Sequence, residues 1–337
     1  MGDHSNIQWT DATWSPTVGC TRVSDGCTNC YAFQLHDQRH AAYLAGRMPN
    51  APAQYHRPFS KVQLIPERLS LPLRWTKPRC IFVDSMSDLF HADVPNDYLV
   101  RVFAAMAAAP QHQFQVLTKR PQRMHRFVTE AANNLEAIRV QMNELEFDLM
   151  RPLTETVPQW PLPNVWLGTS VENQAAAYRI DWLVKTPAAV RFLSCEPLLG
   201  PVDLAPYLCQ HWSHNGCADA EGVWECMQCG QRHRDVPDER GSITVLELLP
   251  GTPRSEYRVR REMVSRGRTI DWVIAGGESG PDFRPLDLDW ARGLRDQCVA
   301  AGVPYFHKQN GGRTAKAGGR ELDGRTWDEM PQVLQAA

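Results

Sequence analysis

The sequence predicts an α/β fold, a partial (β/α) barrel of about six to seven parallel strands with an inserted metal-binding subdomain. The first observation is that short apolar or β-branched runs alternate with amphipathic helical stretches, the pattern of parallel strands joined by crossovers. The second is that these runs are continuously apolar, which suits a sheet buried on both faces. The chain has 337 residues, enough for one large domain with an insert.

Each predicted strand ends in polar residues that precede a helical stretch. The strands cover residues 79–83, 114–117, 165–168, 190–193, 272–275 and 304–306. Residues 97–109 and 287–301 carry apolar residues at helical spacing, and residues 130–150 are predicted to form one long helix. Because the carboxyl ends of parallel strands meet at one edge, the polar residues there predict a shared site.

Composition excludes several classes of protein. Hydrophobic residues make up 43% of the chain and charged residues 22%, which is ordinary globular composition rather than disordered or fibrous. The formal net charge of −2 leaves no overall basic field for gripping nucleic acid. The sequence has no long apolar run and no signal-peptide pattern at its start, so we expect no membrane segment and a cytoplasmic location.

A first group of cysteines, Cys20, Cys27 and Cys30, has the spacing C-x6-C-x2-C. Clustered thiols in a reducing compartment indicate metal rather than disulfides. Three thiolates fit a [4Fe–4S] cluster with one open iron, whereas structural zinc normally takes four protein ligands. Gly19 and Gly26 let the backbone wrap a cluster closely.

Other interpretations of this group stay open. A zinc ion completed by His36 or His40 is one, and three unliganded core cysteines are another, although the loop is polar and rich in glycine. A helix is expected to begin near Tyr31, where its first amides would help to stabilise an anionic cluster.

A second group of cysteines lies in a polar insert, residues 204–268, which interrupts the alternation of strands and helices. Cys209, Cys217, Cys226 and Cys229 supply four thiols, which suits a zinc knuckle-like subdomain stabilised by the metal. A second iron–sulfur cluster is the alternative. A basic stretch beyond them is a possible contact for nucleic acid or a solvated helix face: Arg254, Arg258, Arg260, Arg261, Arg266 and Arg268.

Seven stretches of the chain resemble a phage- and prophage-associated family of unknown function. They are WTDATWSPTVGCTRVSDGCTNCYA, DSMSDLFHADVP, LTKRPQRM, LGTSVENQ, FLSCEPLLGPVDL, WVIAGGESGPDFRP and YFHKQNGG. The first also resembles the first strand and cluster loop of the radical S-adenosylmethionine (SAM) superfamily, which usually spaces its cysteines C-x3-C-x2-C.

The second resemblance implies a radical SAM-like partial (β/α) barrel, formed by residues 1–203 and 269–337. It implies a [4Fe–4S] cluster that cleaves SAM to a 5′-deoxyadenosyl radical, with electrons from a reductant such as flavodoxin or ferredoxin. The cofactor supplies the hard chemistry and the protein orients it. Modification or repair of nucleic acid is a plausible task in the light of the phage association.

Position at the strand ends assigns roles to the polar residues. We predict three catalytic residues: Lys119, Glu196 and Glu278. We predict five cofactor-binding residues: Asp84, Ser85, Ser170, Glu172 and Lys308. Two other functions stay open. One is a non-catalytic iron–sulfur or zinc protein that binds nucleic acid or a protein partner. The other is a hydrolase or nuclease in which strand-end carboxylates hold a divalent metal.

Overall fold

The computed structural model describes residues 5–208, 270–314 and 316–331, together with the backbone of four short strands between residues 224 and 263. Seven parallel strands form one curled sheet in the order β1-β4-β5-β6-β7-β12-β13. Their bounds are β1 (Ala12–Trp14), β4 (Cys80–Val83), β5 (Gln113–Thr118), β6 (Val165–Ser170), β7 (Val190–Cys195), β12 (Trp272–Gly276) and β13 (Tyr305–Gln309). This sheet confirms the predicted partial (β/α) barrel.

Helices follow most strands. They are α1 (Tyr31–Leu44), α2 (Leu71–Arg74), α3 (Asn96–Ala107), α4 (Pro121–Ala131), α5 (Leu135–Asp148), α6 (Tyr178–Lys185), α7 (Ala205–Leu208) and α8 (Leu288–Ala301). The predicted helices at 97–109 and 287–301 are confirmed as α3 and α8. Among the described helices, none is both long and apolar enough to cross a membrane.

The predicted long helix at residues 130–150 is wrong at its start. Helix α4 ends at Ala131, and α5 begins only at Leu135 after a turn in which the Asn134 amide donates to the Ala131 carbonyl at 2.9 Å. Asparagine side chains compete for backbone hydrogen bonds and favour caps and turns over helix interiors. The pair Asn133-Asn134 therefore separates two helices.

Small antiparallel pairs complete the fold. β2 (Thr17–Val18) pairs with β3 (Gln63–Leu64). Within the predicted insert, β8 (Trp224–Glu225) pairs with β9 (Arg232–His233), and β10 (Ser242–Leu248) pairs with β11 (Tyr257–Met263). The strands on either side of the insert, β7 and β12, are neighbours in the large sheet. The four cysteines predicted to bind zinc there, and the rest of the basic stretch, lie outside the described residues.

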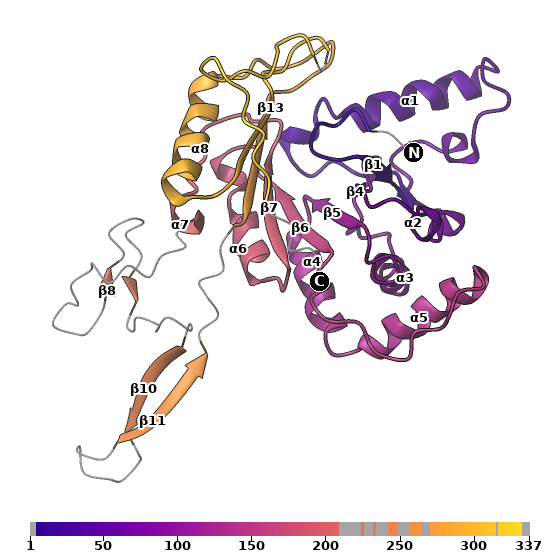
Figure 1. The fold of residues 1–337 in the computed structure, drawn as a ribbon. Coiled ribbons are helices and arrows are strands. Elements are labelled where there is room, and N and C mark those ends of the chain that lie inside the picture. The colour runs from indigo at the N-terminus through magenta and orange to yellow at the C-terminus, as the bar shows by residue number, and fades with distance from the viewer. Residues whose placement is uncertain are drawn as a thin grey trace.

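Side chains of the large sheet alternate between its two faces. Helices α3, α4, α5, α6 and α8 cover the outer face with the main hydrophobic core (Figure 1). The inner face carries a separate layer of buried aromatic and aliphatic side chains. They are Trp9, Phe82, Trp166, Phe192, Trp272, Ile274 and Phe306.

The inward-facing side chains of β6 and β7 become smaller toward the carboxyl ends of these strands. On β7, inward Phe192 is followed by inward Ser194, while Leu193 between them joins the outer core. On β6, Trp166 is followed by Gly168, where a β-carbon would lie 2.5 Å from the Phe192 ring. The inside of the half-barrel therefore has an aromatic floor and becomes smaller and more polar toward the carboxyl ends of the strands.

Candidate functional site

A cavity of about 490 Å³ lies above the aromatic floor, at the carboxyl ends of the strands. Residues at or just after the ends of β4, β5, β6, β7, β12 and β13 all contribute to its wall. Ten of the residues predicted from the sequence line it: Cys20, Cys27, Cys30, Asp84, Ser85, Lys119, Ser170, Glu196, Glu278 and Lys308. Glu172 is not among the lining residues. Most of the residues predicted at the strand ends therefore line one cavity.

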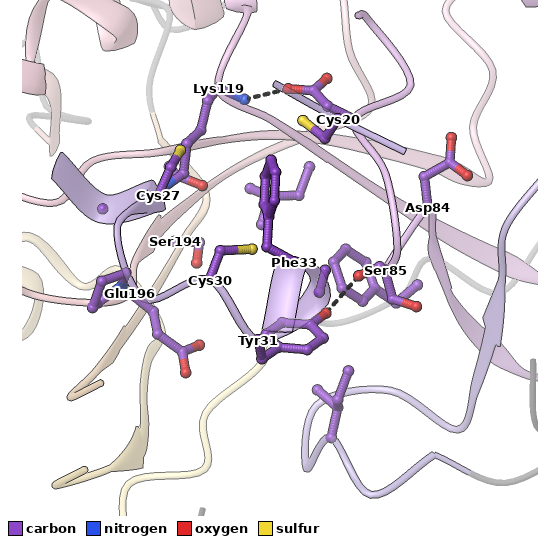
Figure 2. A pocket seen from close by; sticks show the side chains of 18 of the residues that line it. Cys20, Cys27, Cys30, Tyr31, Phe33, Asp84, Ser85, Lys119, Ser194 and Glu196 are labelled. Carbon is purple, nitrogen blue, oxygen red and sulfur yellow. Dashed lines mark hydrogen bonds between the residues drawn. The ribbon is translucent and has the colours of Figure 1, made fainter. Parts of the chain in front are cut away.

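The cysteine loop, residues 20–30, forms one side of this cavity. Cys20, Cys27 and Cys30 are unpaired thiols. Figure 2 shows their side chains reaching into the cavity, with the Phe33 ring beside them. Cys20 and Cys30 pack against the small hydrophobic cluster that contains Phe33 and Phe59.

The thiols differ in their electrostatic surroundings. Burial raises the pKa of the Cys20 thiol to about 11, and the nearby Asp88 carboxylate raises it further. Burial also disfavours the thiolate of Cys27. There, the Lys119 charge and hydrogen bonds around the loop outweigh burial, and the pKa of Cys27 is lowered.

Glu172, at the end of β6, holds the middle of the cysteine loop. This carboxylate is 1% exposed and accepts a hydrogen bond from the Ser24 hydroxyl at 2.7 Å. It also pairs with Lys119 and, at 2.8 Å, with the buried guanidinium of Arg179. Burial alone would raise the pKa of Glu172, but the two cations hold it below its usual value.

Glu278, just after β12, holds the end of the loop. It accepts hydrogen bonds from the Asn29 amide at 3.0 Å and from the Arg284 guanidinium at 2.7 Å. Arg284 also donates to the carbonyl of Asp25 at 3.0 Å. Glu278 lines the cavity, and both of its carboxylate oxygens accept hydrogen bonds from Asn29 or Arg284, so it helps to position the end of the loop.

Arg120, after β5, holds the start of the loop. Its guanidinium pairs with Asp88 at 2.7 Å, donates to the Thr21 carbonyl at 3.0 Å and contacts the Cys20 sulfur at 3.6 Å. The loop is thus tied to the ends of β5, β6 and β12 by charged side chains.

A further hydrogen bond connects Tyr31, which follows the cysteine loop, to the end of β4. The Tyr31 hydroxyl donates to the Ser85 carbonyl at 2.6 Å (Figure 2). Ser85 therefore contributes its backbone to the architecture, and its hydroxyl has no hydrogen-bond partner among the described residues.

Another part of the cavity wall, near Cys30 and Tyr31, presents an ion pair (Figure 2). Lys308 donates to Glu196 at 2.6 Å, and both side chains are 18% exposed. The Gln309 amide donates to the same carboxylate oxygen at 3.2 Å. Beside them, Ser170 and Ser194 face each other in the register of β6 and β7 and both line the cavity. Neither hydroxyl has a hydrogen-bond partner in the described part of the chain.

Asp84, just after β4, is a buried residue of the cavity wall. Its carboxylate accepts hydrogen bonds from the Thr17 amide at 3.1 Å and the Thr17 hydroxyl at 2.8 Å. Burial outweighs these bonds and raises the pKa of Asp84 to about 7. Its φ of 59° lies in the left-handed region, which a non-glycine residue seldom adopts.

The donor set suits an iron–sulfur cluster better than the zinc alternative. Three free thiols line one cavity, whereas the side chains of His36 and His40 bond to backbone carbonyls and do not line it. In the described ranges, no three Cys, His, Asp or Glu side chains converge as a ready-made metal site. The three thiols line the same cavity but do not come together in the structure.

Several residues of this site were not predicted. Ser24, Asn29, Arg179 and Arg284 anchor the loop, and Ser194 and Gln309 extend the polar wall. Their partners lie up to 249 residues away in the sequence, so local spacing carries no signal for them. The exceptions are Ser194 and Gln309, which come within three residues of the ends of the predicted strands 190–193 and 304–306.

The fold and the site together define a class of protein: an α/β half-barrel whose mouth is bordered by a three-cysteine loop. The chain belongs to the family described as Protein of unknown function (DUF5131), whose model matches residues 4–331. No curated protein and no solved structure matches the chain.

Proposed function

We propose that this protein is a radical SAM-like enzyme in which Cys20, Cys27 and Cys30 hold a [4Fe–4S] cluster. The observation that carries the proposal is that three unpaired thiols line the main cavity, at the carboxyl ends of parallel strands. These strand ends are where barrel enzymes build their active sites. A bound, reduced cluster would supply the electron that cleaves the sulfonium of SAM.

The chain's own residues have three tasks in this proposal. Glu172, Glu278 and Arg120 keep the cysteine loop in place before any cofactor binds. The aromatic floor excludes water from below. The Glu196–Lys308 pair and the free hydroxyls offer one anionic, one cationic and several neutral hydrogen-bonding groups to a polar ligand.

The proposal extends to the setting in which the protein works. All six cysteines in the described ranges are free, which fits a reducing cytoplasm. There, a flavodoxin- or ferredoxin-type carrier would provide the electron.

A metal-dependent hydrolase receives less support from the site. Its carboxylates would have to be available to a divalent cation. Asp88, Glu172 and Glu278 are instead bound by arginine or lysine side chains that hold the cysteine loop.

The test is anaerobic reconstitution with iron and sulfide, followed by reduction, addition of SAM and an assay of 5′-deoxyadenosine. Cys27→Ala should abolish the product, whereas Cys80→Ala, a half-buried thiol outside the cavity, should retain it. A cluster that forms but neither binds nor cleaves SAM would point to the non-catalytic binding protein. Stoichiometric zinc with no iron uptake would overturn the proposal.

A further inference from the structure

A second, smaller hollow of about 180 Å³ lies between the first turns of α3 and α4. We call it the α3–α4 hollow. Its lining residues are Asn96, Gln122, Arg123, Arg126 and Phe127. The set contains two guanidinium groups, two side-chain amides and no carboxylate.

The two arginines of this hollow lack a counter-ion. One nitrogen of Arg123 donates to the Val94 carbonyl and, at 3.3 Å, to the Asn96 side chain. Its Nη1 is buried without a hydrogen-bond partner. Within the described part of the chain, neither Arg123 nor Arg126 forms an ion pair.

Nearby carboxylates have other partners, and none of them lines the hollow. Asp88 is bound by Arg120 at 2.7 Å, Asp93 lies 3.8 Å from the His91 ring, and Asp97, in the first turn of α3, accepts from the Tyr98 amide at 2.9 Å. Burial lowers the pKa of Arg123, the Asp88 charge offsets part of this shift, and the positive charges of Arg120 and Arg126 lower the pKa further. The hollow therefore keeps an excess of positive charge that Asp88 offsets only in part.

Helix geometry adds to this charge. Asn96 is the first residue of α3, and Gln122 and Arg123 lie in the first turn of α4. The helix dipole favours anions at such a turn, although in α4 Pro121 has no amide hydrogen and the Arg123 amide already donates to the Arg120 carbonyl at 3.1 Å. Guanidinium groups add charge-assisted hydrogen bonds to phosphate or carboxylate oxygens.

The hollow also has a definite relation to the main cavity. Arg120 lines that cavity and immediately precedes α4. Gln122, which lines the hollow, stands two residues further on, so the backbones at these two positions lie within about 7 Å of each other. One ligand of modest length can therefore reach both places.

We propose that the α3–α4 hollow binds a phosphate group, and that this phosphate belongs to a substrate whose reacting part lies in the main cavity. The second half of this statement rests on the proposed function, whereas phosphate binding by the hollow does not. The substrate class is thus a phosphate ester.

The first test measures the binding of inorganic phosphate to the full chain by calorimetry at low ionic strength, without iron or SAM. Arg126→Gln should weaken binding about tenfold or more, and Arg126→Lys should restore part of it. Arg47→Gln, an exposed arginine outside both pockets, should bind like the wild type. Phosphate binding that survives Arg126→Gln, or that Arg47→Gln weakens equally, would overturn the site.

The second test compares ribose 5-phosphate with inorganic phosphate on the same protein. Tighter binding of the ester, lost in Lys308→Met but not in Arg47→Gln, would support a ligand that spans both places. Equal binding of the two probes would overturn the substrate half and leave an independent anion site. Because neither measurement uses the cluster, failure of the proposed SAM chemistry would not affect them.

Discussion

The Glu172 carboxylate lies directly against the backbone of Gly26. A β-carbon at position 26 would lie 2.5 Å from the Cγ of Glu172. The carboxylate has no freedom to retreat, because Ser24, Lys119 and Arg179 hold it from three directions. The approach of the cysteine loop to β6 therefore depends on a glycine that stands next to the second cysteine.

Gly26→Ala should disturb the cysteine loop. The added methyl group forces either the loop or Glu172 to move, so we expect a lower Tm and loss of iron uptake. Iron per chain after reconstitution, together with thermal unfolding, measures both. Gly293→Ala is the matched control, because nothing lies within 4 Å of its added methyl group in α8. It should gain up to about 1 kcal/mol in stability, and normal iron content in Gly26→Ala would contradict this account.

Glu172→Gln should destabilise the fold itself. Removal of the negative charge leaves Lys119 and the buried Arg179 uncompensated, which in comparable cases costs about 3–5 kcal/mol. Urea unfolding measures the change in free energy of unfolding. Glu136→Gln, which breaks an exposed pair with Arg139 on α5, should have a far smaller effect. Equal effects of the two variants would show that Glu172 does not anchor the loop.

Stability should decrease as pH rises through neutrality, on account of Asp84. Burial raises the pKa of this carboxyl to about 7 in the folded protein, above the unfolded value of about 3.9. Between these values the folded state binds more protons than the unfolded state, so the free energy of unfolding falls as pH rises.

Asp84→Asn should remove much of this slope, since the amide stays neutral and can still accept from the Thr17 amide. The measurement is Tm between about pH 5 and pH 8, with exposed Asp37→Asn as the control. A slope that is unchanged in Asp84→Asn would assign the pH dependence to another group.

Substitution of the Glu196–Lys308 ion pair should separate effects on ligand chemistry from effects on cluster assembly. Glu196→Gln and Lys308→Met change groups that line the cavity but do not bond to the cysteine loop. We expect normal iron content and a decrease in 5′-deoxyadenosine formation of about tenfold or more for each.

The double variant tests whether the two groups act together. Its loss should be smaller than the product of the single losses, because the residues form one ion pair. Loss of iron in either single variant would show instead that this wall is structural.

The sequence pattern was sufficient to predict six of the seven strands of the large sheet. It was not sufficient to predict the contacts that anchor the cysteine loop. Continuous apolar runs such as 165–168 predicted buried parallel strands, and β6 extends only two residues beyond that range. The helix boundary at Asn133-Asn134 was missed because periodicity persists across a short turn.

For the residues of the site, the chemical role was harder to predict than the position at a strand end. Glu172 and Glu278 were predicted to act on cofactor or substrate, yet both bond to the cysteine loop through partners 148 and 249 residues distant in sequence. Only the fold brings those partners together. In the sequence, a polar residue that binds a ligand and one that anchors a loop both stand just after a strand and cannot be told apart.

The aromatic floor gives the protein an optical reporter. Trp9 borders the cavity, its ring centroid lies 6.2 Å from that of Trp272, and Trp272 lies 5.8 Å from Trp166. Excitation of any of these indoles can pass to its neighbours and reach the one that borders the cavity. A light-absorbing group bound above the floor should therefore quench the emission of all three, so intrinsic fluorescence would follow the filling of the cavity without a label.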